Sequence, residues 1–229
     1  MVSLGTDLVD ARFLAREKKF IVHARIGSRV VNAFLSQTGR LTEILHPGIP
    51  IIMRRASDKA KLPFEVLAAR EGDTYVVIDS RVPNLVAAEA LEAHQMRPLS
   101  PYTRVLREQV VGNHRIDFVL EGVSPKYLEV KGCTLKVGSS ALYPDAPTER
   151  GREHLKVLTN LQRRGISTIL LFLAMRPDVT SFRVNSMMDP EFDELLQRSV
   201  EAGTRVISYS TNFSNSHVKL NRRLRLTLK

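Results

Sequence analysis

The sequence contains no tryptophan, and its aromatic content is only 6%. Sugar-binding sites depend on aromatic platforms, so this scarcity argues against a sugar-binding protein. The one cysteine, Cys133, excludes an intrachain disulfide and a cysteine-rich zinc cluster. We expect Cys133 to be a small core residue at the end of a strand rather than a nucleophile. The six histidines nowhere show the spacing of zinc ligands.

Long hydrophobic runs are also missing. The longest apolar stretch, residues 166–175, has the length of a strand, whereas a membrane helix needs about 18 apolar residues. In residues 1–27 apolar side chains alternate with charges, so a continuous signal-peptide core is absent. We therefore expect a cytoplasmic protein that does not contact a membrane. Its 229 residues, 43% of them apolar, suffice for one large or two small domains, and no pattern indicates an oligomeric state.

Basic residues outnumber acidic residues by 34 to 24, which gives a formal net charge of +10. A field of this sign favours polyanionic partners, above all nucleic acid, over neutral ones. A solvated cationic surface without a partner is the alternative. The last 13 residues contain no acidic residue and five basic ones: Lys219, Arg222, Arg223, Arg225 and Lys229. We expect Arg222, Arg223 and Arg225 to contact nucleic acid from the edge of the last strand.

Polar and apolar side chains alternate with period two in the first part of the chain, residues 1–82. This period, interrupted by short turns, predicts five or six strands and no helix. Such strands indicate a small closed barrel of the OB-fold type, and barrels of this kind commonly bind oligonucleotides. A barrel that only packs against its neighbour is the alternative. The predicted strands cover residues 8–16, 20–26, 30–35, 49–54, 65–69 and 75–79.

The second part, residues 83–229, mixes helices with strands, so the fold class is all-β followed by α/β. We expect Asn84 and Thr148 to cap two helices, and a third helix to begin at Asp189-Pro190. Three consecutive strands, with a turn at Gly112–Asn113, should form an antiparallel meander, and two later strands that each follow a helix should extend it into a mixed sheet. The predicted elements cover residues 84–95, 104–111, 114–121, 127–133, 148–164, 167–174, 189–202, 204–209 and 223–228, and residues 138–147 form a loop.

Three charged residues in this meander suggest a catalytic site. Side chains alternate along a strand, so Glu129 and Lys131 should share one face, and Asp117 should approach them from the preceding strand. Two adjacent carboxylates repel each other unless a divalent cation lies between them. Mg²⁺ or Mn²⁺ could be held by Asp117, Glu129 and the Val130 carbonyl, and Lys131 could stabilise charge on a phosphodiester. A structural ion-pair cluster is the alternative.

This order of elements and residues resembles the restriction-endonuclease-like, PD-(D/E)xK fold. The proline of that motif is absent, because Arg115-Ile116 precede Asp117. Four blocks, in this order, are similar to the sugar fermentation stimulation protein A family: 115–118 (RIDF), 127–131 (YLEVK), 143–155 (YPDAPTERGREHL) and 189–192 (DPEF). The resemblance spans essentially the whole chain, and the block from Tyr143 to Leu155 is its specific part.

The resemblance implies an N-terminal OB-fold barrel followed by a nuclease-like domain, DNA binding, and a link to the regulation of sugar, notably maltose, utilisation. It implies DNA binding more firmly than DNA cleavage. Within the specific block, Arg150, Arg152 and His154 could contact phosphate near the start of a helix, or could belong to a capping cluster and core. Glu89 is a candidate for an additional carboxylate, although a solvated helix face explains it equally simply.

Two functions remain from the sequence. One is a metal-dependent DNA phosphodiesterase of the endonuclease type, acting on single- or double-stranded DNA. The other is a transcriptional regulator that binds DNA without cleaving it. No helix-turn-helix is evident, so we expect binding to be largely independent of DNA sequence in either case.

Overall fold

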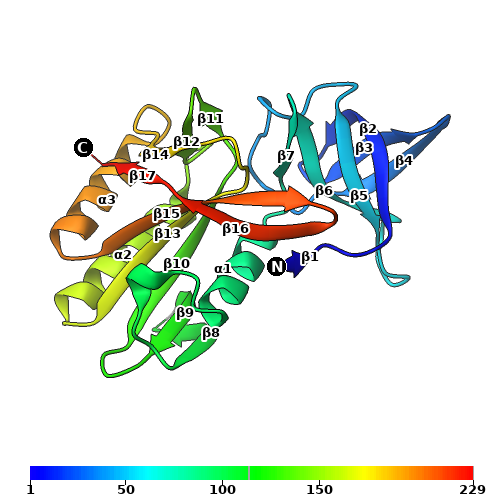
Figure 1. The fold of residues 1–229 in the computed structure, drawn as a ribbon. Helices are drawn as coiled ribbons and strands as arrows, with labels where there is room; N and C mark the ends of the chain where they lie inside the picture. Colours follow the sequence, from blue (N-terminus) through cyan, green and yellow to red (C-terminus); the bar gives the residue numbers. More distant parts are fainter. Residues whose placement is uncertain (113, 229) are drawn as a thin grey trace.

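The structure, a computed structural model, describes residues 1–112 and 114–228. Figure 1 shows two lobes, a β-barrel in blue to cyan and a larger lobe in which helices flank a sheet. Asn113, half of the predicted Gly112–Asn113 turn, and Lys229 lie outside the described residues. The described part contains no helix that is both long and apolar enough to cross a membrane. The cytoplasmic location stays a prediction.

The barrel is built from short strands of alternating polarity. These are β2 (Leu8–Glu17), β3 (Ile21–Ile26), β4 (Arg29–Phe34), β5 (Pro50–Arg55), β6 (Phe64–Glu71) and β7 (Thr74–Val77). Their order in the sheet is β4-β3-β2-β5-β6-β7, and a parallel pairing of Ala33 with Phe64 joins β4 to β6 and closes the ring. Val22, Ala24 and Ile51 are among the side chains that fill its interior. The small closed barrel predicted from the period-two pattern is confirmed.

A mixed sheet of seven strands forms the centre of the larger lobe. In spatial order it contains β1 (Val2–Ser3), β16 (His217–Arg223), β15 (Arg205–Ser214), β13 (Ser167–Ala174), β10 (Lys126–Cys133), β9 (His114–Glu121) and β8 (Arg104–Val111). The predicted meander of β8, β9 and β10 is confirmed. Two helices, α2 (Glu149–Arg163) and α3 (Pro190–Glu201), connect β10, β13 and β15, which run parallel. The division of the chain at residue 82 stays a prediction.

Two of the three predicted helix starts are confirmed. Thr148 Oγ1 accepts a hydrogen bond from the Gly151 amide and caps α2, and α3 begins at Pro190, where Asp189 Oδ1 accepts a hydrogen bond from the Phe192 amide. The prediction for Asn84 is wrong, because α1 (Val82–Glu92) begins two residues earlier. Pro83 has a fixed φ that suits a first helical turn, and it brings the start of the helix forward. Asn84 therefore lies inside the first turn, where its side chain is free to bond elsewhere.

A second, smaller sheet was not predicted. It contains β11 (Lys136–Val137), β12 (Ser140–Tyr143), β14 (Ser181–Val184) and β17 (Arg225–Thr227). The prediction of a loop over residues 138–147 is therefore wrong for the four residues of β12. These strands are too short to show a period, and β12 pairs in parallel with β14, about 40 residues further along the chain. Long-range pairing of this kind leaves no local pattern in the sequence.

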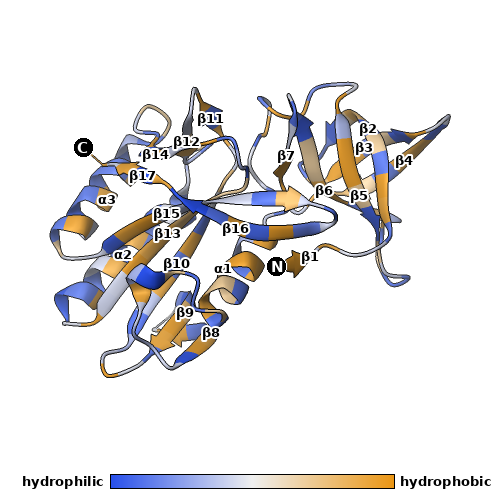
Figure 2. Cartoon of the chain, in the orientation of Figure 1, coloured by the Kyte–Doolittle hydropathy of each residue, from blue (hydrophilic) through white to orange (hydrophobic). Residues whose placement is uncertain are grey.

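The two faces of the large sheet are covered differently. One face shares a cluster of buried side chains with α1 and the barrel, including Leu67 of β6 and Leu171 of β13, whereas α2 and α3 pack on the other face. In Figure 2, α1 between the lobes is mainly apolar, and α2 and α3 mix polar and apolar residues. Arg176, only 1% exposed, adds a polar link, because its guanidinium bonds to Glu71 of the barrel at 3.0 Å.

Candidate active site

Asp117 lies where β9 and β10 separate. The antiparallel register between these strands ends at the pair Phe118 and Leu128, so the next pair, Asp117 and Glu129, is not joined by backbone hydrogen bonds. Instead, Asp117 Oδ2 accepts a 2.8 Å hydrogen bond from the Val130 amide. Its other oxygen, Oδ1, accepts a 2.8 Å bond from the side chain of Asn84. The carboxylate is therefore fixed from both sides.

Glu129 and Lys131 point to the same side of β10, as their spacing predicts. Lys131 Nζ donates a 2.8 Å hydrogen bond to Glu129 Oε1, and the side chains of Glu129 and Lys131 are 2% and 11% exposed. The Nδ1 atom of His154, which faces this pair from α2, contacts the same oxygen. Glu129 Oε2, in contrast, is buried and has no hydrogen-bond partner. One oxygen of this carboxylate is thus doubly engaged while the other is free for a ligand.

His154 links Arg150 to Glu129. Arg150 Nε lies 3.4 Å from His154 Nε2. On the other side of the ring, Nδ1 contacts Glu129 Oε1 and lies 3.2 Å from Lys131 Nζ. The imidazole ring therefore orients Glu129 and joins Arg150 to the carboxylate.

The electrostatics of the two carboxylates differ. Burial raises the pKa of Asp117, and the negative charge of Glu129 raises this pKa further, against the opposing effect of the Val130 amide. Burial also acts to raise the pKa of Glu129, but the hydrogen bond from His154 and the charge of Lys131 outweigh it and lower this pKa. Glu129 is thus held as an anion beside a carboxyl group that resists ionisation. A cation between the two would remove that conflict.

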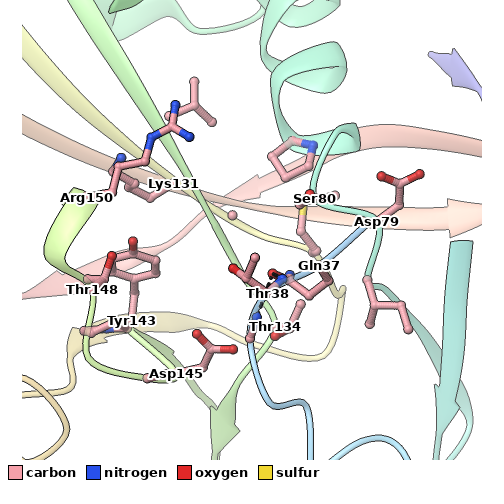
Figure 3. A pocket seen from close by; sticks show the side chains of 18 of the residues that line it. Gln37, Thr38, Asp79, Ser80, Lys131, Thr134, Tyr143, Asp145, Thr148 and Arg150 are labelled. Carbon is pink, nitrogen blue, oxygen red and sulfur yellow. Dashed lines mark hydrogen bonds between the residues drawn. The ribbon is translucent and has the colours of Figure 1, made fainter. Parts of the chain in front are cut away.

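The site opens into a cavity of about 660 Å³ between the two lobes. Figure 3 shows Lys131 and Arg150 on one side of it, and Gln37, Asp79 and Ser80 on the other. The barrel contributes through residues 37–40, the segment between β4 and β5. None of these four barrel residues was identified from the sequence, because polar loop residues carry no period that would place them next to a site far along the chain.

Of the residues expected to contact phosphate, Arg150 and His154 line the cavity. They also line a second cavity of about 400 Å³ together with His114 and Arg115. Arg152 points elsewhere, since its guanidinium pairs with Asp189 and Glu191 near the start of α3. Three further arginines, Arg222, Arg223 and Arg225, are exposed on β16 and β17 and do not line the cavity. Contact of these residues with nucleic acid stays a prediction.

Two other residues singled out in the sequence have structural roles. Glu89 Oε1 lies 2.6 Å from the amino group of Met1 and does not line the cavity, so it is not an additional carboxylate of the site. Cys133 is buried, and burial raises the pKa of its thiol well above the ordinary value. A thiol of this kind is unreactive at neutral pH, in agreement with the expected core position.

The donor set suits a weakly held, hard cation. The described residues contain no group of three or more His, Cys, Asp or Glu side chains placed to hold a metal ion. The unpartnered Oε2 of Glu129 and the remaining lone pairs of Asp117 nevertheless offer oxygen ligands, and both residues line the cavity. Magnesium-type ions are commonly bound by one or two carboxylates and several water molecules. The residues present therefore fit such an ion.

A closed six-stranded barrel joined to a mixed sheet with paired carboxylates and a lysine defines a two-lobed protein with an OB-type barrel and an α/β domain. Comparison with known proteins agrees with this class. A family model described as "SfsA N-terminal OB domain" matches residues 14–78, and one described as "Sugar fermentation stimulation protein RE domain" matches residues 81–217. The chain belongs to the sugar fermentation stimulation protein family, as its sequence motifs suggest.

Relatives of similar length support this assignment. The chain is 38% identical to the sugar fermentation stimulation protein homolog of Moorella thermoacetica, with 96% of this chain and 97% of that protein covered. It is 36% identical to the homolog of Chloroflexus aurantiacus, with 96% and 85% covered. A solved structure, that of Pyrococcus furiosus SfsA in complex with Ca²⁺, is 27% identical and matches with a TM-score of 0.92 over 99% of this chain and 98% of that chain. The predicted fold class is confirmed.

Proposed function

We propose that the protein binds DNA and hydrolyses its phosphodiester bonds with the help of a divalent cation, Mg²⁺ or Mn²⁺. The observation that carries this proposal is the buried Oε2 of Glu129, which lacks a hydrogen-bond partner and belongs to a residue that lines the same cavity as Asp117 and Lys131. Buried polar atoms are rarely left unsatisfied, and exceptions commonly mark a position for an ion or a substrate. Two carboxylates and a lysine in one cavity suit phosphodiester chemistry.

Asp117 and Glu129 would hold the cation. Both oxygens of Asp117 already accept one hydrogen bond each, but a carboxylate oxygen has two lone pairs, so each keeps one. Val130 contributes its amide to Asp117, and its carbonyl as a third ligand stays a prediction. When bound, a divalent cation supplies Lewis-acid stabilisation of the phosphate and lowers the pKa of a water molecule.

The remaining polar groups of the site bind the phosphates of the substrate and orient Glu129. Lys131 Nζ lies at the cavity, where its ammonium group can donate to a phosphate oxygen once a cation competes for Glu129. His154 keeps Glu129 in place through the contact of its Nδ1 atom with Oε1. Arg150, which lines both cavities, is placed to pair with a second phosphate group.

Two further observations support the proposal. The structure of the Pyrococcus furiosus relative contains Ca²⁺, a hard cation that takes oxygen ligands as Mg²⁺ does. The net charge of +10 favours a polyanion as the partner.

A DNA-binding regulator that does not cleave is the second candidate. It is favoured by the contact of Lys131 and His154 with Glu129 Oε1, which partly neutralises the site without a metal.

A cleavage assay separates the two candidates. Labelled single-stranded DNA and supercoiled plasmid are incubated with the wild type in Mg²⁺, in Mn²⁺ and in a chelator, beside Asp117→Asn and Glu129→Gln. Glu89→Gln is the matched control, because it removes a carboxylate that lies outside the cavity. We expect metal-dependent cleavage that both site variants lose and the control retains. DNA binding without cleavage in either metal would favour the regulator.

A further inference from the structure

The barrel holds its cavity-lining segment, residues 37–40, in a fixed position. Arg16 on β2 donates hydrogen bonds to the carbonyl oxygens of Gln37 at 2.5 Å, Gly39 at 2.7 Å and Arg40 at 3.1 Å. Three bonds from one planar guanidinium leave this segment little freedom. The barrel wall of the cavity is therefore preorganised rather than a loose loop.

This segment also contacts the larger lobe. Gly39 packs so closely against the carboxylate of Asp145 that a methyl group in place of its hydrogen would overlap the Asp145 oxygen. Asp145 lies between β12 and α2, beside Tyr143 and Thr148, and Figure 3 shows it at the side of the cavity. Barrel and sheet lobe thus meet across the cavity, and the contact sets its width.

The charges that line the cavity suit a chain of phosphates. Lys19, Arg40 and Arg150 line it and form no salt bridge with any residue that the structure describes. Asp79, which also lines it, is neutralised by Arg81 at 2.6 Å. With a cation between Asp117 and Glu129, the lining is positive. Nucleic-acid strands bind to such grooves through their phosphates.

The cavity is too small to enclose a double helix. A duplex is wider than its major groove, which alone measures about 12 Å, whereas the cavity has a volume of only about 660 Å³ between walls from two lobes. Glu129 and Lys131 lie at its floor and are nearly buried, so the reacting phosphate has to enter. The second cavity continues from the first at Arg150 and His154, which suits a polymer that extends beyond one nucleotide. Enzymes with enclosed sites act on single strands or unpair the target first.

We propose that the interlobe cavity takes a single, unpaired DNA strand, with Lys19 and Arg40 of the barrel binding the phosphates on one side of the reacting bond and Arg150 on the other. This assignment rests on the proposed function and names its substrate. Base preference is small, because Tyr143, the one aromatic residue that lines the cavity in the described part of the chain, packs against Phe172 and Phe192. Few other surfaces are left for stacking with bases.

The test compares a labelled thymidine oligonucleotide of about 16 residues with a duplex closed by hairpins at both ends, which has no frayed terminus. Binding is measured by fluorescence anisotropy in Ca²⁺, and cleavage in Mg²⁺ and Mn²⁺. Arg40→Ala is compared with Arg29→Ala, since both remove one exposed arginine of the barrel and only Arg40 lines the cavity. Thermal melting shows that both variants are folded.

We expect the single strand to bind at least about tenfold more tightly than the closed duplex, equivalent to about 1.4 kcal/mol. Arg40→Ala should weaken that binding several-fold and lower the rate of single-strand cleavage, whereas Arg29→Ala should behave as the wild type. Equal binding and cleavage of the closed duplex, or equal effects of the two substitutions, would overturn the assignment while leaving a metal-dependent nuclease intact. A wild type that neither binds nor cleaves any DNA would overturn the proposed function as well.

Discussion

Asn84 in the first turn of α1 donates a 2.8 Å hydrogen bond to Oδ1 of Asp117 on β9. Because the Val130 amide holds Oδ2 of the same carboxylate, Asp117 can hardly rotate. Groups that orient a metal ligand in this way commonly influence affinity nearly as much as the ligands themselves. The first helix therefore takes part in the site although it contributes no carboxylate to it.

The first prediction concerns this contact. Asn84→Ala leaves both proposed ligands in place but frees Asp117 on one side, so we expect the affinity for Mn²⁺ to fall about 10- to 100-fold. Leu85→Ala is the control, since Leu85 is 45% exposed on the same helix turn. Calorimetric titration measures both variants. An affinity equal to that of the wild type in Asn84→Ala would show that Asp117 is not oriented from α1.

Lys131 should stabilise the protein when metal is absent. Its ammonium group pairs with Glu129 where both side chains are nearly buried, and removal of one partner leaves a buried charge poorly compensated. We expect Lys131→Met to lower the free energy of unfolding by about 3 kcal/mol in chelator. Lys156→Met, which breaks an exposed pair with Glu153, should change stability little. Urea denaturation that finds the two variants equally stable would contradict the pairing.

The contributions of Asp117 and Asp178 to the stability of the protein should change with pH in opposite directions. Burial and the charge of Glu129 raise the pKa of Asp117, so its contribution to stability is present in acid and is lost as the pH rises through that raised pKa. Without metal, Asp117→Asn should therefore gain stability relative to the wild type over this rise in pH. Urea denaturation in chelator at a series of pH values measures the difference.

Asp178 provides the control, because its pKa is shifted in the opposite direction to that of Asp117. Burial acts to raise its pKa, but hydrogen bonds from Arg176 and Lys136 outweigh burial and lower it. Its contribution is thus present above the ordinary aspartate pKa and is lost as the pH falls through the lowered value. Asp178→Asn should lose most stability at neutral pH and less in acid. A stability difference for Asp117→Asn that does not vary with pH would contradict the raised pKa.

Alternation of side chains was sufficient to predict the centre of the site. Glu129 and Lys131 are two apart on a strand, and the short connection to the preceding strand brings Asp117 beside them, so local patterns define these three residues. The cap at Thr148 and the helix start at Asp189-Pro190 were equally predictable, because the residues that start a helix act within three positions along the chain.

Residues that act across the fold were not predictable. Asn84 reaches Asp117 over 33 positions, and Arg176 joins Glu71 over 105. Nothing near either residue in the chain marks its partner, since these contacts arise only when the lobes pack. The residue type of Asn84 suits a helix cap, but Pro83 favours a first helical turn and α1 begins before Asn84.

The last prediction concerns the basic strands at the C-terminal end. Replacement of Arg222, Arg223 and Arg225 by alanine should flatten the dependence of DNA affinity on salt, by about 0.9 in the log–log slope for each phosphate contact that is lost. Cleavage chemistry at saturating DNA should be unchanged, because these arginines do not line the cavity. Anisotropy titrations over a range of salt concentrations measure the slope. A slope identical to that of the wild type would remove these strands from the DNA-binding surface.

The position of the cation is the most direct test of the proposed chemistry. Crystals soaked in Mn²⁺ and measured near the manganese absorption edge give an anomalous map that locates the ion without reference to activity. We predict a peak between Asp117 and Oε2 of Glu129, at coordination distances of about 2.1 Å typical of hard oxygen ligands, and no such peak in Asp117→Asn. A peak elsewhere, or none at this position in the wild type at saturating Mn²⁺, would contradict the metal site and with it the proposed mechanism.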